Sequence, residues 1–312
     1  HCFSKCQNLE FVKIEANIKR LPNEVFSECP SLREVHLPET IKFLGNSAFK
    51  NCFHLSHIDL PNGLEIIEDD CFYNCASLSK ILLPSSLIHI GNNSFTNTGI
   101  TSIMIPNKII KLNDGIFKNC KNLMDIVLSD NLISIGNNTF DGCMSLKNIK
   151  LPKHLAEIGS AAFSNCINIE NIILPSNVEY INTSTFSNCS SLKYINILGI
   201  IKGIDSFAFS NCQKLKYVYM KNGIKYINHR AFQNCKSIKS ILLPSSIKQI
   251  SENAFDGCED LGSIVLPSSL IPVTNFLSHI MQCNNIKVYL YDRYYTNSDY
   301  IDVKKIRICE MI

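Results

Sequence analysis

Apolar residues recur along this chain with one fixed period. A phenylalanine returns every 23 residues, with a single interval of 22, and each unit follows F-x-x-C-x-x-L-x-x-I-x-L-P-x-x-L-x-x-I. The twelve repeat phenylalanines are Phe3, Phe26, Phe49, Phe72, Phe95, Phe117, Phe140, Phe163, Phe186, Phe209, Phe232 and Phe255. Self-similarity at a period of roughly 20 to 50 residues is typical of solenoids, in which each repeat packs on its neighbours. The pattern therefore predicts a stack of about twelve coils.

The I-x-L step in each unit predicts a short strand. Its two apolar residues are two positions apart, so both side chains point to the same, inward face. The proline that usually follows has no N–H to donate and ends the strand. We expect the strands of stacked units to pair in parallel about 4.8 Å apart, so that the coils span roughly 55 Å.

The segment around each repeat phenylalanine predicts a turn on the face opposite the strand. Three residues before it, most units carry a helix-capping residue such as Asn46, which precedes Phe49. Two residues after it stands asparagine or glycine, as at Asn51, and these residues best tolerate a left-handed backbone. We therefore expect one short helical or 3₁₀ turn per unit, with its phenylalanine stacked on those of neighbouring coils.

The spacing resembles the BspA-like, Treponema-type class of leucine-rich repeats, whose unit also runs A-F-x-x-C-x-x-L-x-x-I-x-L-P. One matching unit is Ala48, Phe49, Cys52, Leu55, Ile58, Leu60 and Pro61, and another is Ala231, Phe232, Cys235, Ile238, Ile241, Leu243 and Pro244. The resemblance implies an α/β-type leucine-rich-repeat solenoid that is mostly β, with a parallel sheet on one face. It also implies a surface protein of the kind that binds host proteins or other microbes.

The repeat has departures and an end. Thr98 replaces the cysteine in the short unit, and Ser129, Leu198 and Lys221 replace the proline. We expect strands to run slightly longer near Leu198 and Lys221. The pattern fails after Val273, which predicts a solenoid over residues 1–275, begun within a repeat without its N-terminal cap, and a C-terminal cap segment over residues 276–312.

Composition excludes several classes of protein. With 46% hydrophobic and 18% charged residues, the chain is too apolar to be disordered. The net charge of +3 and the absence of a basic block argue against a nucleic-acid partner. Its apolar stretches are too short to span a bilayer. Since none of the common catalytic or nucleotide-binding motifs is present, we expect no enzymatic activity and no cofactor.

Eleven of the fifteen cysteines lie three residues after a repeat phenylalanine. They could form a redox or metal-binding series, or they could be small buried apolar side chains. We favour packing, because metal ligands cluster in short loops and do not recur every 23 residues without histidine. Cys283 and Cys309 lie outside the repeats, and a disulfide between them that pins the C-terminal cap is a hypothesis.

Residues on either side of the inward isoleucine of each strand face outward, and two patches among them could bind a ligand. The first is Glu34, His36, His57 and Asp59 on adjacent strands, either a Zn²⁺ site or, as we favour, a solvated polar patch. The second patch consists of aromatic and aliphatic residues with lysines at its edge: Tyr194, Tyr217, Tyr219, Leu242, Lys193, Lys216 and Lys239. Such a surface is typical of a protein-binding hot spot, while carbohydrate, nucleic acid or no ligand remain alternatives.

The sequence leaves two alternative functions, each with its own cellular location. The first is a non-catalytic, adhesin-like module at the cell surface that binds a protein through its outward sheet face. The second is a structural scaffold component in the cytoplasm. Among four N-x-S/T sequons, Asn92 and Asn137 fall at turns on the outer face, where a glycan fits and would favour the surface. The many buried cysteines favour a reducing compartment.

Overall fold

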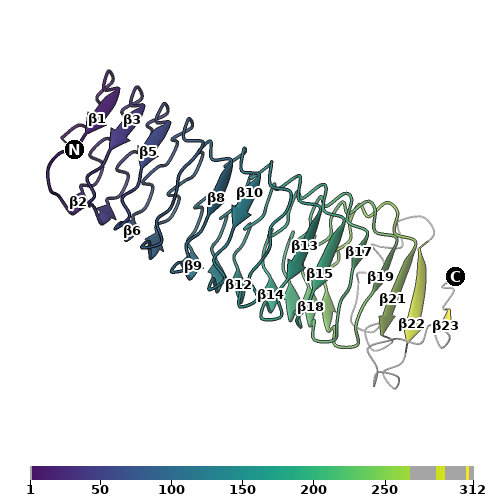
Figure 1. Cartoon of the computed structure of the whole chain (residues 1–312). Coiled ribbons are helices and arrows are strands. Elements are labelled where there is room, and N and C mark those ends of the chain that lie inside the picture. Colours follow the sequence, from purple (N-terminus) through teal and green to yellow (C-terminus); the bar gives the residue numbers. More distant parts are fainter. Residues whose placement is uncertain (1, 268–285, 292–306, 309–312) are drawn as a thin grey trace. The chain divides into compact units, whose positions relative to one another are not determined.

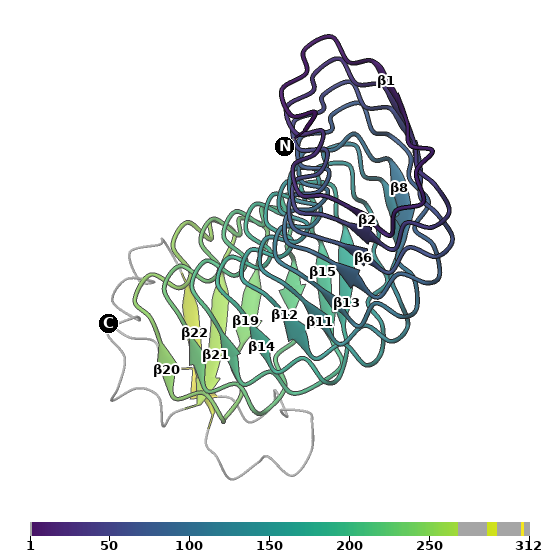
Figure 2. The same ribbon diagram turned by 90° about the vertical axis from the view of Figure 1, so that its left-hand side faces the viewer.

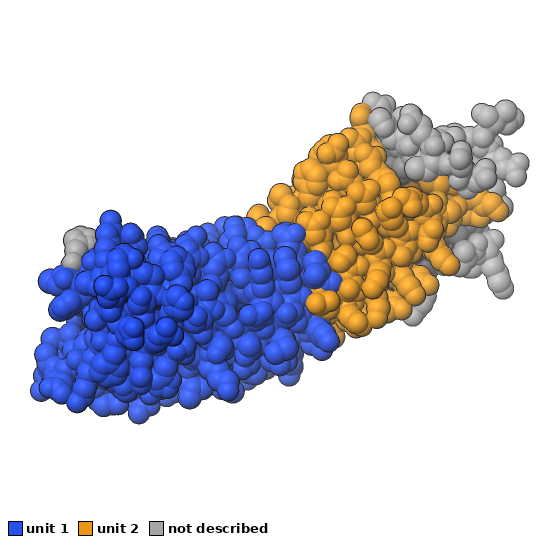
Figure 3. Space-filling view, turned by 90° about the horizontal axis from the view of Figure 1, so that it is seen from above, with its two compact units in different colours: residues 1–155, 162–167 blue, residues 156–161, 168–312 orange. Residues whose placement is uncertain are grey.

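The computed structural model describes residues 2–267, 286–291 and 307–308. The chain forms a solenoid of about 11 turns of parallel strands, which is the predicted fold class. It divides into two compact units (Figure 3), unit 1 with residues 1–155 and 162–167, and unit 2 with residues 156–161 and 168–312. We describe each unit by itself.

Most coils contribute to two series of strands, and the coils of Ile81 and Ile149 contribute only to the second. In unit 1 the first series is β1 (Phe11–Lys13), β3 (Glu34–His36), β5 (His57–Asp59), β8 (Ser102–Met104) and β10 (Asp125–Val127). The second series is β2 (Arg20–Leu21), β4 (Phe43–Leu44), β6 (Ile66–Ile67), β7 (His89–Ile90), β9 (Lys111–Leu112) and β11 (Ser134–Ile135) (Figure 1). The first series occupies the predicted I-x-L position, whereas the second series, two residues long, was not predicted.

Unit 2 repeats this arrangement. Its first series is β13 (Asn171–Leu174), β15 (Tyr194–Ile197), β17 (Tyr217–Val218), β19 (Ser240–Leu242), β21 (Ser263–Pro267) and β22 (Lys287–Tyr291), followed by β23 (Arg307–Ile308). Its second series is β12 (Glu157–Ile158), β14 (Tyr180–Ile181), β16 (Gly203–Ile204), β18 (Tyr226–Ile227) and β20 (Gln249–Ile250). Figure 2 shows β19, β21 and β22 side by side, and β23 adds an antiparallel partner to β22.

Pairing within each series is parallel and in register by one repeat, as predicted. Glu34 of β3 faces His57 of β5, and Tyr194 of β15 faces Tyr217 of β17. A strand is four residues long before Leu198, as expected there, but β17 has only two residues, so the expected lengthening near Lys221 is wrong. The boundary at residues 275 and 276 lies outside the described residues, and the C-terminal cap remains a prediction.

The expected helical turn is wrong, because the described residues contain no helix. Around Phe49 the backbone amides alternate between two kinds of acceptor. The amides of Ser47, Phe49 and Asn51 donate to carbonyl oxygens of the next coil at 2.8–2.9 Å. Those of Ala48 and Lys50 donate to carbonyls three residues earlier. Since alternate amides leave the coil, successive bonds cannot build a helix, and consecutive hydrogen-bonded turns form instead.

The side chains expected to cap helices cap the next coil instead. Asn46 accepts the backbone amide of Asp69 at 3.1 Å, and Asp69 accepts that of Asn92 at 2.6 Å. The residue two after the phenylalanine is left-handed as predicted, with φ 62° at Asn51. Asparagines at this position also bond one another, since the Asn74 amide nitrogen donates to the Asn51 oxygen at 2.8 Å. Polar side chains therefore tie successive coils together on this side.

The core is a stack of identical side chains. In unit 1 the rings of Phe49 and Phe95 each lie 5.3 Å from that of Phe72, with interplanar angles of 8°. In unit 2 the rings of Phe209 and Phe232 lie 5.2 Å apart. Burial of one aromatic ring per coil gives each repeat interface a large share of its stability.

Candidate protein-binding face

The two tyrosines at the centre of the predicted aromatic patch form a stacked pair. Tyr194 begins β15 and Tyr217 begins β17, and the two residues are direct partners in the parallel pairing. Their ring centroids are 6.2 Å apart with an interplanar angle of 9°. The rings are held on strands yet face solvent, with 45% of Tyr194 and 60% of Tyr217 exposed.

Apolar residues two positions further along each coil widen this patch. Tyr219 directly follows β17 and is 53% exposed, and Leu242 of β19 is 39% exposed. Ile173 of β13 is 55% exposed in the same repeat position. The inward residues Ile195 and Ile241 are buried and Val218 is half-buried, so the outward series stands on inward-facing apolar side chains. The face is thus a pre-organised apolar surface. We call Tyr194, Tyr217, Tyr219 and Leu242 the tyrosine face.

The lysines beside the tyrosine face differ from one another. The Lys193 ammonium lies 2.7 Å from a carboxylate oxygen of Glu170 and is neutralised within the chain. Among the described residues, neither Lys216 nor Lys239 has a carboxylate within ion-pair distance. These two lysines line a cavity of about 220 Å³ together with Tyr217, Ser237 and Asp260. The cationic edge of the face is therefore formed by Lys216 and Lys239.

Ser237 and Asp260 are the members of this site that sequence reasoning missed. Each lies five residues after a repeat phenylalanine, in the turn that leads to the next strand. They line the cavity together with Lys216 and Lys239, each of which lies seven residues after a repeat phenylalanine. The repeat carries a signal for this proximity, because Asp260 and Lys239 stand only two positions apart within the repeat, at five and seven residues after their phenylalanines.

The acidic and histidine patch on β3 and β5 has the predicted register but separates into two pairs. His36 lies 2.9 Å from Glu34, and His57 lies 3.4 Å from Asp59, each within its own strand. The ring of Phe11 lies 5.2 Å from that of His36. In the described ranges no group of three or more histidine, cysteine or acidic side chains is placed to hold a metal ion. The four residues form a solvent-exposed polar patch.

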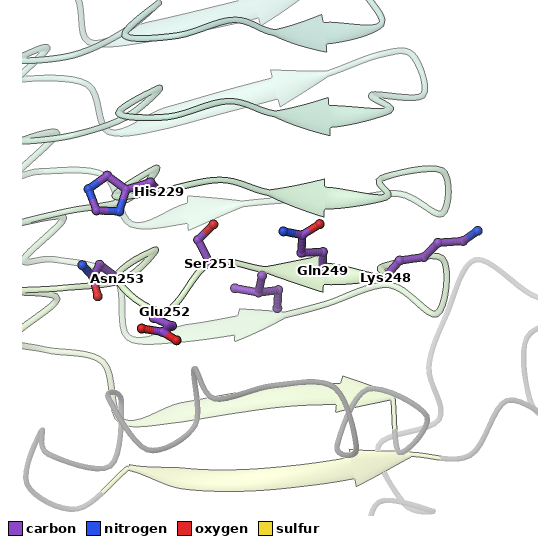
Figure 4. Close-up of a pocket in the computed structure, with 7 residues that line it drawn as sticks. His229, Lys248, Gln249, Ser251, Glu252 and Asn253 are labelled. Atoms are coloured by element: carbon purple, nitrogen blue, oxygen red, sulfur yellow. The ribbon is translucent and has the colours of Figure 1, made fainter.

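Two other hollows lie away from the tyrosine face. In unit 1 a groove of about 770 Å³ is lined in part by Met104, Pro106 and Val127. In unit 2 a hollow of about 630 Å³ is lined by residues that include His229, Lys248 and Glu252. In Figure 4 Lys248 extends away from His229 and Glu252, so these polar groups do not converge on one point.

The thiols of the repeat cysteines are buried and unreactive by environment. The Cys52 thiol donates to the backbone oxygen of Phe26 at 3.0 Å, one coil earlier, and this contact recurs along both units. Burial raises the pKa of Cys52 to about 12 and that of Cys120 to about 11. At neutral pH these thiols are protonated, so burial leaves them little thiolate for nucleophilic attack. The described cysteines carry thiols rather than disulfides.

The predicted modification sites fall partly within the described residues. Asn92 and Asn137 are exposed at the turns, as expected. Both side chains form hydrogen bonds between adjacent coils. The Asn92 side-chain oxygen accepts the backbone amide of Asp114 at 3.1 Å, and the Asn137 side-chain nitrogen donates to the Asp114 carboxylate at 3.1 Å. Cys283 and Cys309 lie outside the described residues, so their disulfide stays a hypothesis. Within the described part, no helix is long and apolar enough to cross a membrane.

A family model covers most of the chain. The model described as BspA type leucine rich repeat region matches in six copies over residues 1–124, 110–239 and 191–297. No curated protein sequence matches.

Solved structures share the fold. A leucine-rich repeat protein from Bacteroides ovatus is 24% identical with a TM-score of 0.53, over 90% of this chain and 92% of that one. A leucine rich cell surface protein from Faecalibacterium prausnitzii is 23% identical with a TM-score of 0.57, over 90% and 88%. The pneumococcal vaccine antigen PcpA is 21% identical with a TM-score of 0.53, over 88% and 71%. At these identities the likeness shows the fold alone.

Proposed function

This chain belongs to the BspA-type leucine-rich-repeat family, and on that premise we propose that it is a non-catalytic recognition module that binds a partner protein through the tyrosine face. The observation that carries the proposal is the stacked, solvent-exposed pair of Tyr194 and Tyr217 on paired strands. Exposed aromatic rings are costly in water and are the residues on which binding energy concentrates in protein interfaces.

The rigidity of the strands that carry the tyrosine face also favours protein binding. The tyrosine face sits on paired strands, and the inward residues Ile195 and Ile241 are buried while Val218 is half-buried, so its side chains lose little freedom when a partner binds. Repeat solenoids offer extended surfaces of this kind because adjacent coils present equivalent positions side by side. A protein partner, rather than a small molecule, matches an exposed face that extends over adjacent strands.

We place this recognition at the cell surface, as an adhesin-like activity. The proposal is supported by the fold that the chain shares with a protein named for the cell surface of Faecalibacterium prausnitzii and with the vaccine antigen PcpA. Exposed sequons at Asn92 and Asn137 are compatible with a secreted protein.

A cytoplasmic scaffold is the second candidate, and one observation favours it. Eleven buried cysteines of the described residues carry thiols, which a reducing compartment preserves. In that case the tyrosine face would bind another subunit of an intracellular assembly.

One experiment separates the two candidates. The 312-residue chain is used to select binders from two yeast-displayed libraries, one of secreted and surface proteins and one of intracellular proteins. We expect binders from the surface library that bind at least tenfold more weakly to the double variant Tyr194→Ala/Tyr217→Ala. Binders from the intracellular library alone would favour the scaffold. Selected binders that are insensitive to the tyrosine substitutions would contradict recognition by this face.

A further inference from the structure

The cavity beside Tyr217 brings two lysines together with one carboxylate. Lys193 is paired with Glu170 at 2.7 Å, and Lys236 is paired with Glu259 at 2.7 Å. Around the cavity, by contrast, two lysines share the space with the single carboxylate of Asp260. Lys216 and Lys239 occupy the same repeat position on adjacent coils, where strand spacing brings their backbones about 4.8 Å apart. Since Asp260 offsets only one of these two positive charges, the cavity keeps a net positive charge that favours an anionic guest.

The position of the cavity beside the tyrosine face indicates which chemical group would carry the anion. Tyr217 lines the cavity and also stacks on Tyr194, so one residue joins the cationic hollow to the aromatic surface. Its volume of about 220 Å³ is enough for an acidic side chain. The Ser237 hydroxyl on the cavity wall adds a neutral hydrogen-bonding group. A guest that fills both sites must carry an anionic group next to an apolar or aromatic one.

We infer that this cavity receives the carboxylate of an aspartate or glutamate in an extended segment of the partner protein, whose neighbouring apolar side chain lies on the tyrosine face. The inference rests on the proposed function and specifies its partner. Lys216 and Lys239 donate to the guest carboxylate, and the aromatic pair supplies the apolar contact. Asp260 opposes the guest through its own negative charge, so it lowers the affinity for an acidic segment.

The test uses the whole chain and an immobilised library of seven-residue peptides. We expect enrichment of peptides in which aspartate or glutamate stands beside an aromatic or aliphatic residue. The variant Lys216→Gln/Lys239→Gln should bind these peptides at least tenfold more weakly. The variant Lys214→Gln/Lys236→Gln is the matched control, because it removes the same charge from unit 2 outside the cavity and should bind as the parent does. Asp260→Asn should bind a few-fold more tightly.

The outcomes separate this inference from the proposed function. If the peptides depend on Tyr194 and Tyr217 but not on the two lysines, the tyrosine face stands and the carboxylate site is wrong. Enrichment without a preference for acidic residues, or no enrichment at all, also overturns the inference. A sulfated oligosaccharide that binds the cavity where acidic peptides do not would overturn it in favour of a glycan. The displayed-protein selection tests the proposed function independently of peptides.

Discussion

The thiol of Cys52 lies 3.0 Å from the backbone oxygen of Phe26 and donates a hydrogen bond to it across the boundary between two coils. The same oxygen position accepts a backbone amide within its own coil, as when the Cys52 amide donates to Phe49 at 3.1 Å. Each repeat carbonyl thus joins a turn to the following coil. This explains the cysteine series without redox or metal chemistry, because the small side chain fits beside the ring and satisfies a buried acceptor.

Replacing one of these cysteines should therefore cost stability without affecting binding. Cys52→Ala removes the bond to Phe26 and leaves a small void at a fully buried position. We expect a loss of about 1–2 kcal/mol, measured by thermal or denaturant unfolding. Thr98→Cys is the control, since it introduces the usual residue at the one repeat where threonine stands and should change stability by less than about 1 kcal/mol.

The asparagines two residues after each repeat phenylalanine should stabilise the fold both through their side-chain hydrogen bonds and through their left-handed backbone. Asn74 donates to Asn51 at 2.8 Å and has φ 60°. Asn74→Gly loses the side-chain bonds but keeps the left-handed backbone, as Gly142 does in another repeat with φ 77°. Asn74→Ala loses both, so it should be about 1 kcal/mol less stable than the glycine variant. Equal stability of the two variants would show that the backbone conformation is not what selects asparagine here.

Burial of the thiols predicts how stability changes at alkaline pH. The pKa of Cys52 is about 12 in the folded chain, against an ordinary value of 9.0. Above pH 9 the unfolded chain releases this proton while the folded chain retains it, so unfolding becomes more favourable as pH rises toward 12. We expect the melting temperature to fall between pH 8 and pH 10. In Cys52→Ala this fall should be smaller.

The same burial predicts which thiols react in the native protein. Among the described cysteines, Cys2 is exposed and Cys6 is half-buried, while the others are buried. Iodoacetamide at neutral pH, followed by peptide mass mapping, should label Cys2 rapidly and Cys6 more slowly. Rapid labelling of Cys143 or Cys235 in the folded chain would contradict the packing account.

Affinity should depend on the tyrosine face and not on exposed tyrosine in general. Tyr217→Ala removes the central ring of the face and should weaken binding of a selected partner by at least tenfold. Tyr180→Ala is the matched control, because Tyr180 is 42% exposed in unit 2 but lies on the second strand series. The control should bind within twofold of the parent, as measured by biolayer interferometry.

Sequence periodicity predicted the residues that point inward, because burial of Phe72 or Leu78 is dictated by repetition alone. It also predicted the outward register that joins Tyr194 to Tyr217. The second strand series was not predicted, because a two-residue strand such as Phe43–Leu44 is too short to show an alternation of apolar and polar residues. The helical turn was wrong because helix-capping residues such as Asn46 also accept a backbone amide of the neighbouring coil, and sequence order does not show which of the two donors is used.

The candidate site was predictable in part for the same reason. Strand residues are placed by register, so Tyr194, Tyr217 and Leu242 could be located in advance. Charges could not be assigned in this way. Whether a lysine is neutralised depends on side-chain reach between coils, which pairs Lys193 with Glu170 but leaves Lys216 beside a cavity.

Footprinting of the complex tests recognition by the tyrosine face most directly. Hydroxyl-radical labelling of the 312-residue chain, alone and with a selected partner, is read out by mass spectrometry at each tyrosine. Our account predicts that Tyr194, Tyr217 and Tyr219 lose reactivity on binding while Tyr180 keeps it. Protection of Tyr180 with unchanged reactivity at Tyr217 would place the partner elsewhere and contradict the account.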